Sequence, residues 1–282
     1  LSSGVPTAFL FGMVLMICSI GFKISMVPFQ LWAPDIYQGA PTPVTAYLAT
    51  ASKAAGFAAL LRLILTAFAP AEQVLAAVFS VLAAATILYG NLAAIPQTNI
   101  KRLLAYSSIG HAGYLLIGLA TLSSTGKAAV LYYLLSYLFG SAAVFLVIVA
   151  VCKNSDQISE LAGLARRSPV LAAGMMLGLL SLAGVPPLGG FFGKFLVLFS
   201  AAESGLLWLV FIGVVNVVVS LYYFLKIVKA MYLHAPVDPA PLRVSAGQKT
   251  MQYAALGGIF VLGILQGPFV AFTTEALRSF LH

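Results

Sequence analysis

The chain has 282 residues, of which 61% are hydrophobic and only 8% are charged, and its mean hydropathy is +1.03. An ordinary soluble domain carries about 25% charged residues, so the composition excludes a soluble protein and indicates a polytopic membrane protein. The net charge of +8 comes from basic residues scattered singly between apolar runs, which argues against a nucleic-acid-binding face. Cys18 and Cys152 lack CxxC or metal-ligand spacing and indicate neither a disulfide framework nor a metal site.

Apolar runs and helix breakers predict an all-α fold, a helical membrane bundle of about eight transmembrane helices in a single domain, residues 1–282. In chain order the predicted spans are 7–27, 43–67, 72–95, 99–122, 127–151, 169–200 with an interruption, 206–233 and 251–277. Residues 28–42 are expected to form a short re-entrant or interfacial segment. The sizeable polar loops are 153–168 and 234–250. Because the chain begins Leu-Ser-Ser without Met or a signal peptide, we expect it to be a piece of something longer.

The stretch FKISMVPFQLWAPDIYQGAPTPVTAYLATASK places Lys23 and Lys53 inside apolar runs and four prolines between them. A lysine at the centre of a membrane helix costs roughly 2.5–3.5 kcal/mol on insertion scales. Backbone groups freed by a proline are tolerated there only where protein or water satisfies them. Lys53 lies about ten residues into its span, about 15 Å deep. Burial disfavours its charged form and a nearby carboxylate favours it, so the pattern predicts a proton switch on an ion path.

His111 is predicted to lie at a similar depth, in the segment IKRLLAYSSIGHAGY. Ser107, Ser108, His111 and Tyr114 are spaced so that they form one polar stripe on an apolar helix. Histidine titrates near neutral pH, so the stripe favours a proton relay, with an interhelical hydrogen-bonding histidine as the alternative. A weaker stripe, predicted to serve helix packing, comprises Asn216, Ser220 and Tyr223.

A similar motif occurs in two parts of the chain. GVPPLGGFFGKF at 184–195 repeats the theme of FKISMVPFQLW, with a proline break, small or aromatic residues and one lysine, Lys194, but in reversed order. An inverted-topology repeat with one discontinuous helix in each half leaves this pattern in sequence.

Charge placement predicts the orientation of the chain in the membrane. The loops that follow odd-numbered spans hold nine basic residues: Lys101, Arg102, Lys153, Arg166, Arg167, Lys226, Lys229, Arg243 and Lys249. The opposite side holds Arg62, Lys127 and Arg278. The positive-inside rule makes the first side cytoplasmic. All seven acidic residues fall in loops or at span ends, so Lys23, Lys53 and Lys194 are predicted to be buried lysines without a counter-ion at mid-membrane depth.

Three long motifs resemble a known family. PFQLWAPDIYQGAPTPV followed by ATASK, then QTNIKRLLAYSSIGHAGYLLIGLA, and finally SLAGVPPLGGFFGKF are similar to the antiporter-like membrane subunits of proton-pumping NADH:quinone oxidoreductase, respiratory complex I, and most similar to the subunit N group. The resemblance covers essentially the whole chain. It implies a fold of fourteen helices with two inverted five-helix repeats, each containing one broken helix.

On that resemblance, residues 1–68 end the first repeat, 69–235 form the second and 236–282 are a terminal loop and helix. Lys23 and Lys194 match the family's lysines on the two broken helices, Lys53 matches the central lysine of the helix after the first, and His111 falls in the connecting polar axis. The family's buried glutamate would lie upstream of Leu1.

The resemblance implies a proton-translocating membrane subunit that conducts protons through Lys23, Lys53, Lys194 and His111, coupled to remote quinone reduction. It implies no redox centre or cofactor in this chain, and NADH, FMN, iron–sulfur clusters and quinone in partner subunits. The implied partners are other membrane subunits of the complex, the lipid bilayer of the bacterial inner membrane and the missing N-terminal helices, with no nucleic acid. Two alternatives stay open: a subunit of a cation/proton antiporter without redox partners, and a non-conducting structural subunit.

Overall fold

The computed structural model describes residues 6–152, 155–236, 240, 242 and 244–279. Over these residues the chain is helical, and pairing between extended segments is limited to one isolated bridge, between Asn99 and Gln157. The prediction of an all-α membrane bundle is confirmed. Lys153 and Arg243, which entered the charge comparison, lie outside the described residues.

The main helices lie close to the predicted spans. Their bounds are α1 Thr7–Ile24, α2 Trp32–Gly39, α3 Thr42–Tyr47, a π-helical turn Leu48–Ser52, α4 Lys53–Leu65, α5 Glu72–Ala94, α6 Ile100–Ala120, α7 Ser124–Val151, α8 Leu164–Arg167, α9 Pro169–Ala183, α10 Gly189–Glu203, α11 Leu207–Leu233, α12 Ala246–Ile264 and α13 Gln266–Ser279. Short 3₁₀ turns cover Ala69–Ala71 and Ile158–Leu161.

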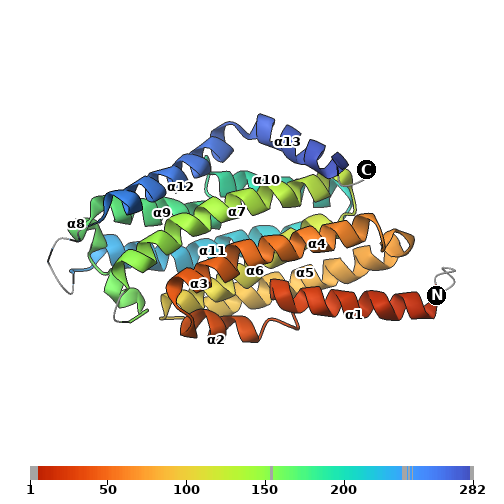
Figure 1. The fold of residues 1–282 in the computed structure, drawn as a ribbon, viewed down its shortest axis with the longest axis horizontal. Coiled ribbons are helices and arrows are strands. Elements are labelled where there is room, and N and C mark those ends of the chain that lie inside the picture. Colours follow the sequence, from red (N-terminus) through yellow and green to blue (C-terminus); the bar gives the residue numbers. More distant parts are fainter. Residues whose placement is uncertain (1–5, 153–154, 237–239, 241, 243, 280–282) are drawn as a thin grey trace.

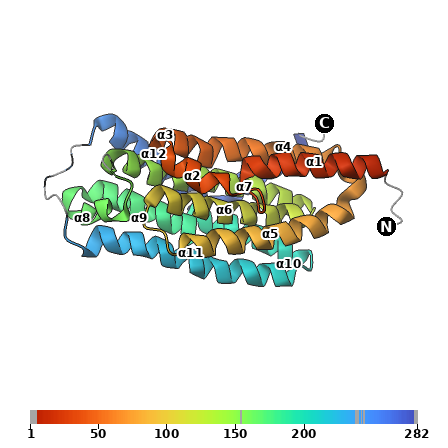
Figure 2. The same ribbon diagram turned by 90° about the horizontal axis from the view of Figure 1, so that it is seen from below.

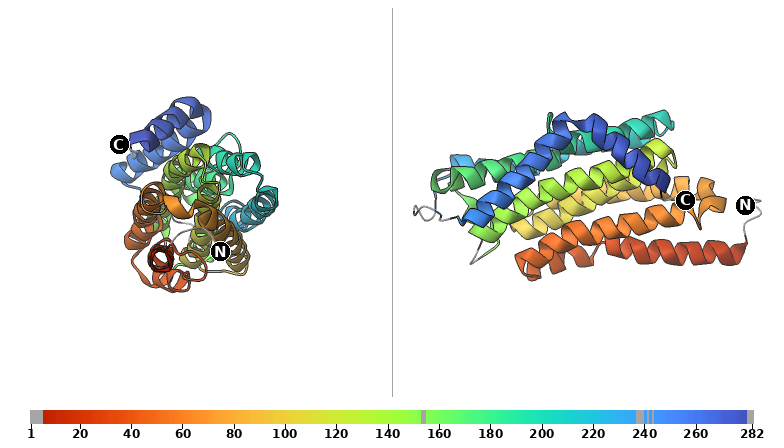
Figure 3. Two further views of the ribbon diagram at one scale, coloured as in Figure 1. Left: turned by 90° about the vertical axis from the view of Figure 1, so that its right-hand side faces the viewer. Right: turned by 45° about the horizontal axis from the view of Figure 1, so that its top comes forward.

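The long helices run side by side along the longest axis of the molecule (Figures 1 and 2). In the described part of the chain, six helical segments are long and apolar enough to cross a membrane, or seven if the bent pair α12 and α13 counts as one span. The apolar helix α9 is shorter and continues, after an interruption, as α10. Seen end-on, α12 and α13 lie along one edge of the bundle (Figure 3).

The helix α6 forms the centre of the bundle, because every residue of it except Arg102 is buried. Its closest neighbour is α5, and glycines allow the two backbones to meet. A Cβ atom on Gly90 would lie 2.4 Å from the backbone nitrogen of Gly110. A Cβ atom on Gly113 would lie 2.7 Å from the backbone nitrogen of Ile87. Small residues at such crossings are typical of membrane helix pairs, which associate through close packing.

Two helices stop inside the bundle with the same kind of cap. Ser25 follows α1 and Gly184 follows α9, both in the left-handed conformation, with φ angles of 61° and 89°. Such caps satisfy the last carbonyl groups of a helix through the next two backbone N–H groups. The chain then resumes as α2 and as α10. The two predicted interruptions are therefore present.

The prolines between Lys23 and Lys53 do not all act as breakers. Pro34 and Pro43 lie in the first turns of α2 and α3, where a proline removes no intrahelical hydrogen bond. The segment 28–42 is consequently a loop followed by one short helix.

The prediction of a continuous span over 251–277 is wrong. α12 ends at Ile264, and α13 starts at Gln266 with its axis turned by 89°. Leu265, between them, leaves the helical conformation with φ −103° and ψ 43°.

The loops rich in basic residues meet at one end of the bundle, where α8 and the start of α12 lie (Figure 1). Lys101 pairs with Asp156 at 2.8 Å, and the Nζ atom of Lys226 donates to the carbonyl of Ile95 at 3.3 Å. The first contact joins the start of α6 to the loop after α7, and the second joins α11 to the loop after α5, so these parts lie on the same side. Which side of the membrane this is remains a prediction from the charge bias.

Candidate functional site

A row of buried polar side chains crosses the apolar interior from α4 to α11. Its members are Lys53 on α4, Ser108, His111 and Tyr114 on α6, Tyr133 on α7, Lys194 on α10 and Ser220 on α11, each no more than 5% exposed. In a membrane protein, ionisable groups at this depth are costly and mark ion or proton paths more often than structural contacts. The row is therefore the candidate site.

Lys53 is the first residue of α4, directly after the π-helical turn Leu48–Ser52. Its Nζ atom donates to the backbone carbonyl of Ser108 at 2.5 Å and contacts the hydroxyl of the same serine at 2.8 Å. Single π turns inside longer helices are rare and frequently occur at functional sites. The pairing of Lys53 with α6 agrees with the prediction that this lysine is buried.

His111 lies one turn further along α6. Its Nδ1 atom is 2.7 Å from the hydroxyl of Tyr133, and its ring centroid is 4.8 Å from that of Tyr137. A histidine that shares a proton with a tyrosine can donate or accept, depending on its tautomer.

Tyr133 and Tyr137 were not among the predicted site residues. Together with Ser141 they are spaced by four residues along α7, so they form a polar stripe like the one on α6. That spacing could have identified them.

Lys194 reaches the broken end of α9. Its Nζ atom donates to the carbonyl of Ala183, the last residue of α9, at 2.9 Å, and is 3.5 Å from the hydroxyl of Ser220. It also lies 4.7 Å from the ring centroid of Tyr114, a cation–π contact. A cation at the carbonyl end of a helix interacts favourably with the helix dipole.

Glycine is needed beside this contact. A Cβ atom on Gly184 would lie 3.0 Å from the Cδ atom of Lys194. The bare backbone therefore leaves room for the lysine to reach the carbonyl.

The stripe on α11 partly joins the site. Tyr223 donates to the side-chain oxygen of Asn91 on α5 at 3.0 Å, a polar contact between helices of the kind predicted for this stripe. Ser220, one turn earlier, instead contacts Lys194. Tyr114 on α6 donates to the backbone carbonyl of Gly213 at 2.7 Å and ties α6 to α11.

The expectation that Lys23 is buried is wrong for the described bundle, where its side chain is exposed. The reason is the position of α1, which packs against α4 with one face and leaves residues such as Phe11 and Phe22 exposed on the other. The stem of Lys23 still lies close to Gly56 on α4. Among the proposed residues, the structure therefore brings Lys53, His111 and Lys194 together and leaves Lys23 at the surface.

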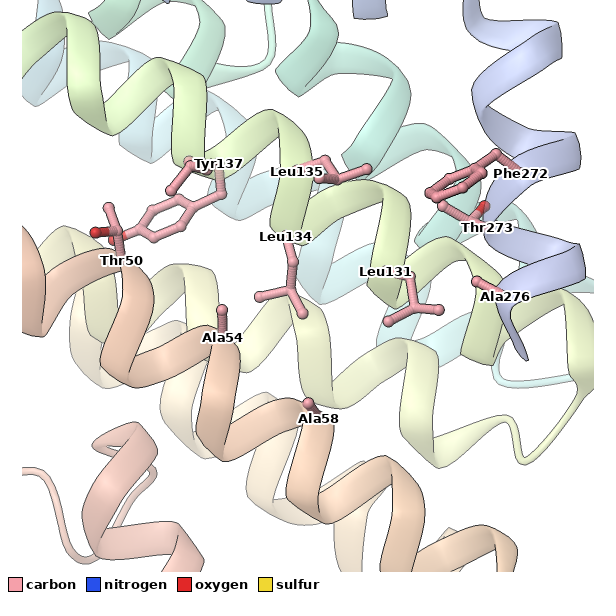
Figure 4. Close-up of a pocket in the computed structure, with 11 residues that line it drawn as sticks. Thr50, Ala54, Ala58, Leu131, Leu134, Leu135, Tyr137, Phe272, Thr273 and Ala276 are labelled. Atoms are coloured by element: carbon pink, nitrogen blue, oxygen red, sulfur yellow. The ribbon is translucent and has the colours of Figure 1, made fainter. Parts of the chain in front are cut away.

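An apolar groove of about 300 Å³ leads from the surface towards this site between α4, α7 and α13 (Figure 4). Thr50 and Tyr137 face one another at one end of it, and Ala54 and Ala58 line its α4 wall (Figure 4). Because Tyr137 also contacts the ring of His111, a single side chain separates the histidine from the groove.

Among the described residues, acidic side chains lie away from the row. Asp35, Asp156 and Glu275 form ion pairs at helix ends or loops, with Arg102, Lys101 and Arg278. The same residues include no group of three His, Cys, Asp or Glu side chains that could hold a metal ion. Within the described chain, Lys53 and Lys194 are satisfied by carbonyl and hydroxyl oxygens rather than by carboxylates.

Comparison with known proteins confirms the predicted resemblance. The model of the NADH:quinone oxidoreductase/Mrp antiporter transmembrane family matches residues 5–220. NADH-quinone oxidoreductase subunit N of Moorella thermoacetica is 46% identical over 280 residues, covering 98% of this chain and 59% of that protein. The subunit N of Heliobacterium modesticaldum is 47% identical over 272 residues. The chain thus spans somewhat over half the length of the curated relatives it matches.

The fold is also similar to those of solved structures. A chain of respiratory complex I from Thermus thermophilus with bound aureothin matches with a TM-score of 0.82 and 35% identity, over 95% of this chain and 60% of that one. A chain of the Mrp complex from a Dietzia species matches with a TM-score of 0.91 over 99% of this chain and 61% of that one, but at 23% identity, so it supports the fold alone.

Proposed function

Since the chain belongs to the NADH:quinone oxidoreductase/Mrp antiporter transmembrane family, we propose that it conducts protons as part of a membrane subunit of NADH:quinone oxidoreductase. The single observation that carries the proposal is the row of buried polar side chains from Lys53 to Lys194. The row joins helices far apart in sequence, and it places two lysines and a histidine in an interior that consists mainly of apolar clusters.

In this proposal each member of the row exchanges a proton with its neighbour. Lys53 hands a proton to the Ser108 end of α6, His111 and Tyr133 pass it on through their shared hydrogen bond, and Lys194 receives it. Water molecules can bridge steps longer than a hydrogen bond when polar groups line the space. Lys23, exposed beside α4, would join the path where further polypeptide covers it.

The driving reaction would take place elsewhere. The buried row offers hydroxyl, imidazole and amine groups for proton exchange. Electron transfer from NADH to quinone, through FMN and iron–sulfur clusters, is assigned to partner subunits, and this chain to the bacterial inner membrane. Residues 1–68 and 69–235 would belong to two inverted repeats. The matching left-handed caps at Ser25 and Gly184 support that division.

A cation/proton antiporter without redox partners is the second candidate. The likeness to the Mrp complex speaks for a common fold, whereas the relatives at 46% and 47% identity are subunits of NADH-quinone oxidoreductase. The second observation is the more specific, so the redox-coupled function is preferred. A sodium-dependent pH change in vesicles without NADH would favour the antiporter.

Two adjacent tyrosines allow a matched test. Tyr133→Phe removes the hydroxyl that contacts His111, whereas Tyr132→Phe removes a hydroxyl that donates to the carbonyl of Leu262, outside the row. Each change deletes one buried hydrogen bond, worth about 0.5–1.5 kcal/mol, so the two variants should lose similar stability. NADH-driven acidification of inverted membrane vesicles with the complete subunit should fall several-fold in Tyr133→Phe alone. Equal pumping by the two variants would remove Tyr133 from the path.

A further inference from the structure

An apolar groove with a volume of about 410 Å³ lies on the outer surface between α10 and α11. Ligand sites in proteins usually fall between about 300 and 1,000 Å³, so the groove is large enough for a small molecule. Three phenylalanines, Phe191, Phe195 and Phe199, form one wall, with stacked rings whose centroids are 6.0 and 5.9 Å apart. Valines of α11 form the other wall.

Lys194 is the one charged residue in the lining of this groove, and it is 3% exposed. An ammonium group has three hydrogen-bond donors. The described residues supply two acceptors, the carbonyl of Ala183 and the hydroxyl of Ser220, and no carboxylate among them forms an ion pair with Lys194. The ring of Tyr114 lies 4.7 Å from the ammonium group as well, but within the described chain the third donor has no oxygen acceptor and the positive charge has no anionic partner.

The position of the groove limits what can enter it. Phe195, Val214 and Val218 are 49%, 51% and 66% exposed, so the groove opens sideways towards the bilayer. Lys194 lies nine residues before the end of α10, about 14 Å from that membrane surface. A ligand must therefore travel through hydrocarbon and present an anionic group at its end. Phosphate ions and nucleotides fail the first condition, and phospholipid head groups stay near the interface.

We propose that this groove binds a long-chain fatty acid, with its carboxylate at the ammonium group of Lys194 and its alkyl chain along the phenylalanine wall. A carboxylic acid enters the bilayer in its neutral form and can ionise beside a cation. The proposal stands apart from proton conduction, because it requires only the charge of Lys194 and the shape of the groove.

The test uses the complete subunit in its assembled complex, in lipid nanodiscs, and a palmitic acid that carries a photoreactive diazirine. After illumination, mass spectrometry should locate the label on α10 and α11. Palmitate should displace the probe at about a tenfold lower concentration than palmityl alcohol, because a hydrogen bond to a charged group is worth about one order of magnitude in affinity or more. Phosphatidic acid should compete no better than the alcohol.

Three variants complete the test. Lys194→Met should abolish the advantage of palmitate over the alcohol. Val214→Trp should block labelling by filling the groove while Lys194 is kept, so it also serves if the lysine variant does not assemble. Phe211→Leu, at a side chain that is 70% exposed and outside the groove lining, should change nothing.

Several results would overturn the proposal. They are equal competition by acid and alcohol, stronger competition by phosphatidic acid, labelling that Val214→Trp does not reduce, and no labelling of α10 and α11 in the assembled complex. The last result would show that a neighbouring subunit covers the groove.

Discussion

Replacement of Gly90 by alanine should weaken the packing of α5 on α6. The new Cβ atom would lie 2.4 Å from the backbone nitrogen of Gly110 and 2.8 Å from the carbonyl oxygen of Tyr106. Ordinary contacts begin near 3.4 Å, so the helices must separate by up to about 1 Å locally. Backbone atoms of two long helices cannot rotate away as a side chain can. The added methyl group therefore strains the whole crossing.

The magnitude follows from two opposing effects. Overpacking in a tight interior costs typically about 1–3 kcal/mol, and contact with backbone favours the upper part of that range. Alanine in place of a helical glycine returns about 0.5–1 kcal/mol. The net expectation is a loss of about 2 kcal/mol in the free energy of unfolding.

A second glycine provides the control. Gly257 lies in α12, and a Cβ atom there would meet nothing within 4 Å. Gly257→Ala should therefore stabilise the protein by about 0.5–1 kcal/mol. Unfolding of the purified complete subunit by sodium dodecyl sulfate, followed by tryptophan fluorescence, should separate the two variants by about 2–3 kcal/mol. If Gly90→Ala were as stable as Gly257→Ala, the close approach of α5 and α6 would not exist in the membrane.

Three further outcomes are expected. Lys53→Arg should depress NADH-driven proton pumping, because arginine stays charged and cannot release a proton to Ser108. Wild-type acidification by this variant would contradict the relay. Asp156→Asn should lower the free energy of unfolding by about 1–3 kcal/mol, because it leaves the buried ammonium group of Lys101 without its ion-pair partner. An unchanged melting temperature in detergent would show that water replaces the lost ion pair. Burial, with the nearby acidic side chains Glu160 and Asp156, raises the pKa of Cys152 to about 12, so almost no thiolate forms at pH 8. Alkylation of Cys152 by iodoacetamide should therefore be far slower than that of an exposed thiol and should become faster as the pH rises. Rapid labelling at pH 8 would refute this burial.

The spans and the buried lysines could be predicted because hydrophobicity and charge act locally. Long apolar runs predict membrane helices wherever they occur, and Lys53 and Lys194 had to be satisfied inside the protein. The breaks near Ser25 and Gly184 followed from proline and glycine in the same way.

The hydrogen-bond partners and the exposure of a side chain depend on which faces of the helices meet, and a single sequence does not contain that information. The prediction for Lys23 failed because the sequence shows only that this lysine lies within an apolar run. Burial of its side chain also requires another helix to pack on the outer face of α1. Tyr133 lies in an apolar run and looks like an aromatic packing residue until α7 is placed against His111. The 89° turn after Ile264 did have a local signal, since Gly267 and Pro268 follow Leu265 and helices commonly end shortly before a proline, but the size of the turn depends on how α13 packs against the bundle.

The burial of α6 has a consequence for how the protein is made. Among the six long spans, α6 has the lowest mean hydropathy, 1.4, and it is also the most buried, at 100% of its apolar segment. A segment of this kind has a weak tendency to leave the translocon for lipid by itself. Its neighbours in the chain, the spans that contain α5 and α7, have hydropathies of 1.9 and 2.5, and short connections join them to it. Biogenesis should therefore insert α6 together with α5 as a helical hairpin rather than as a separate span.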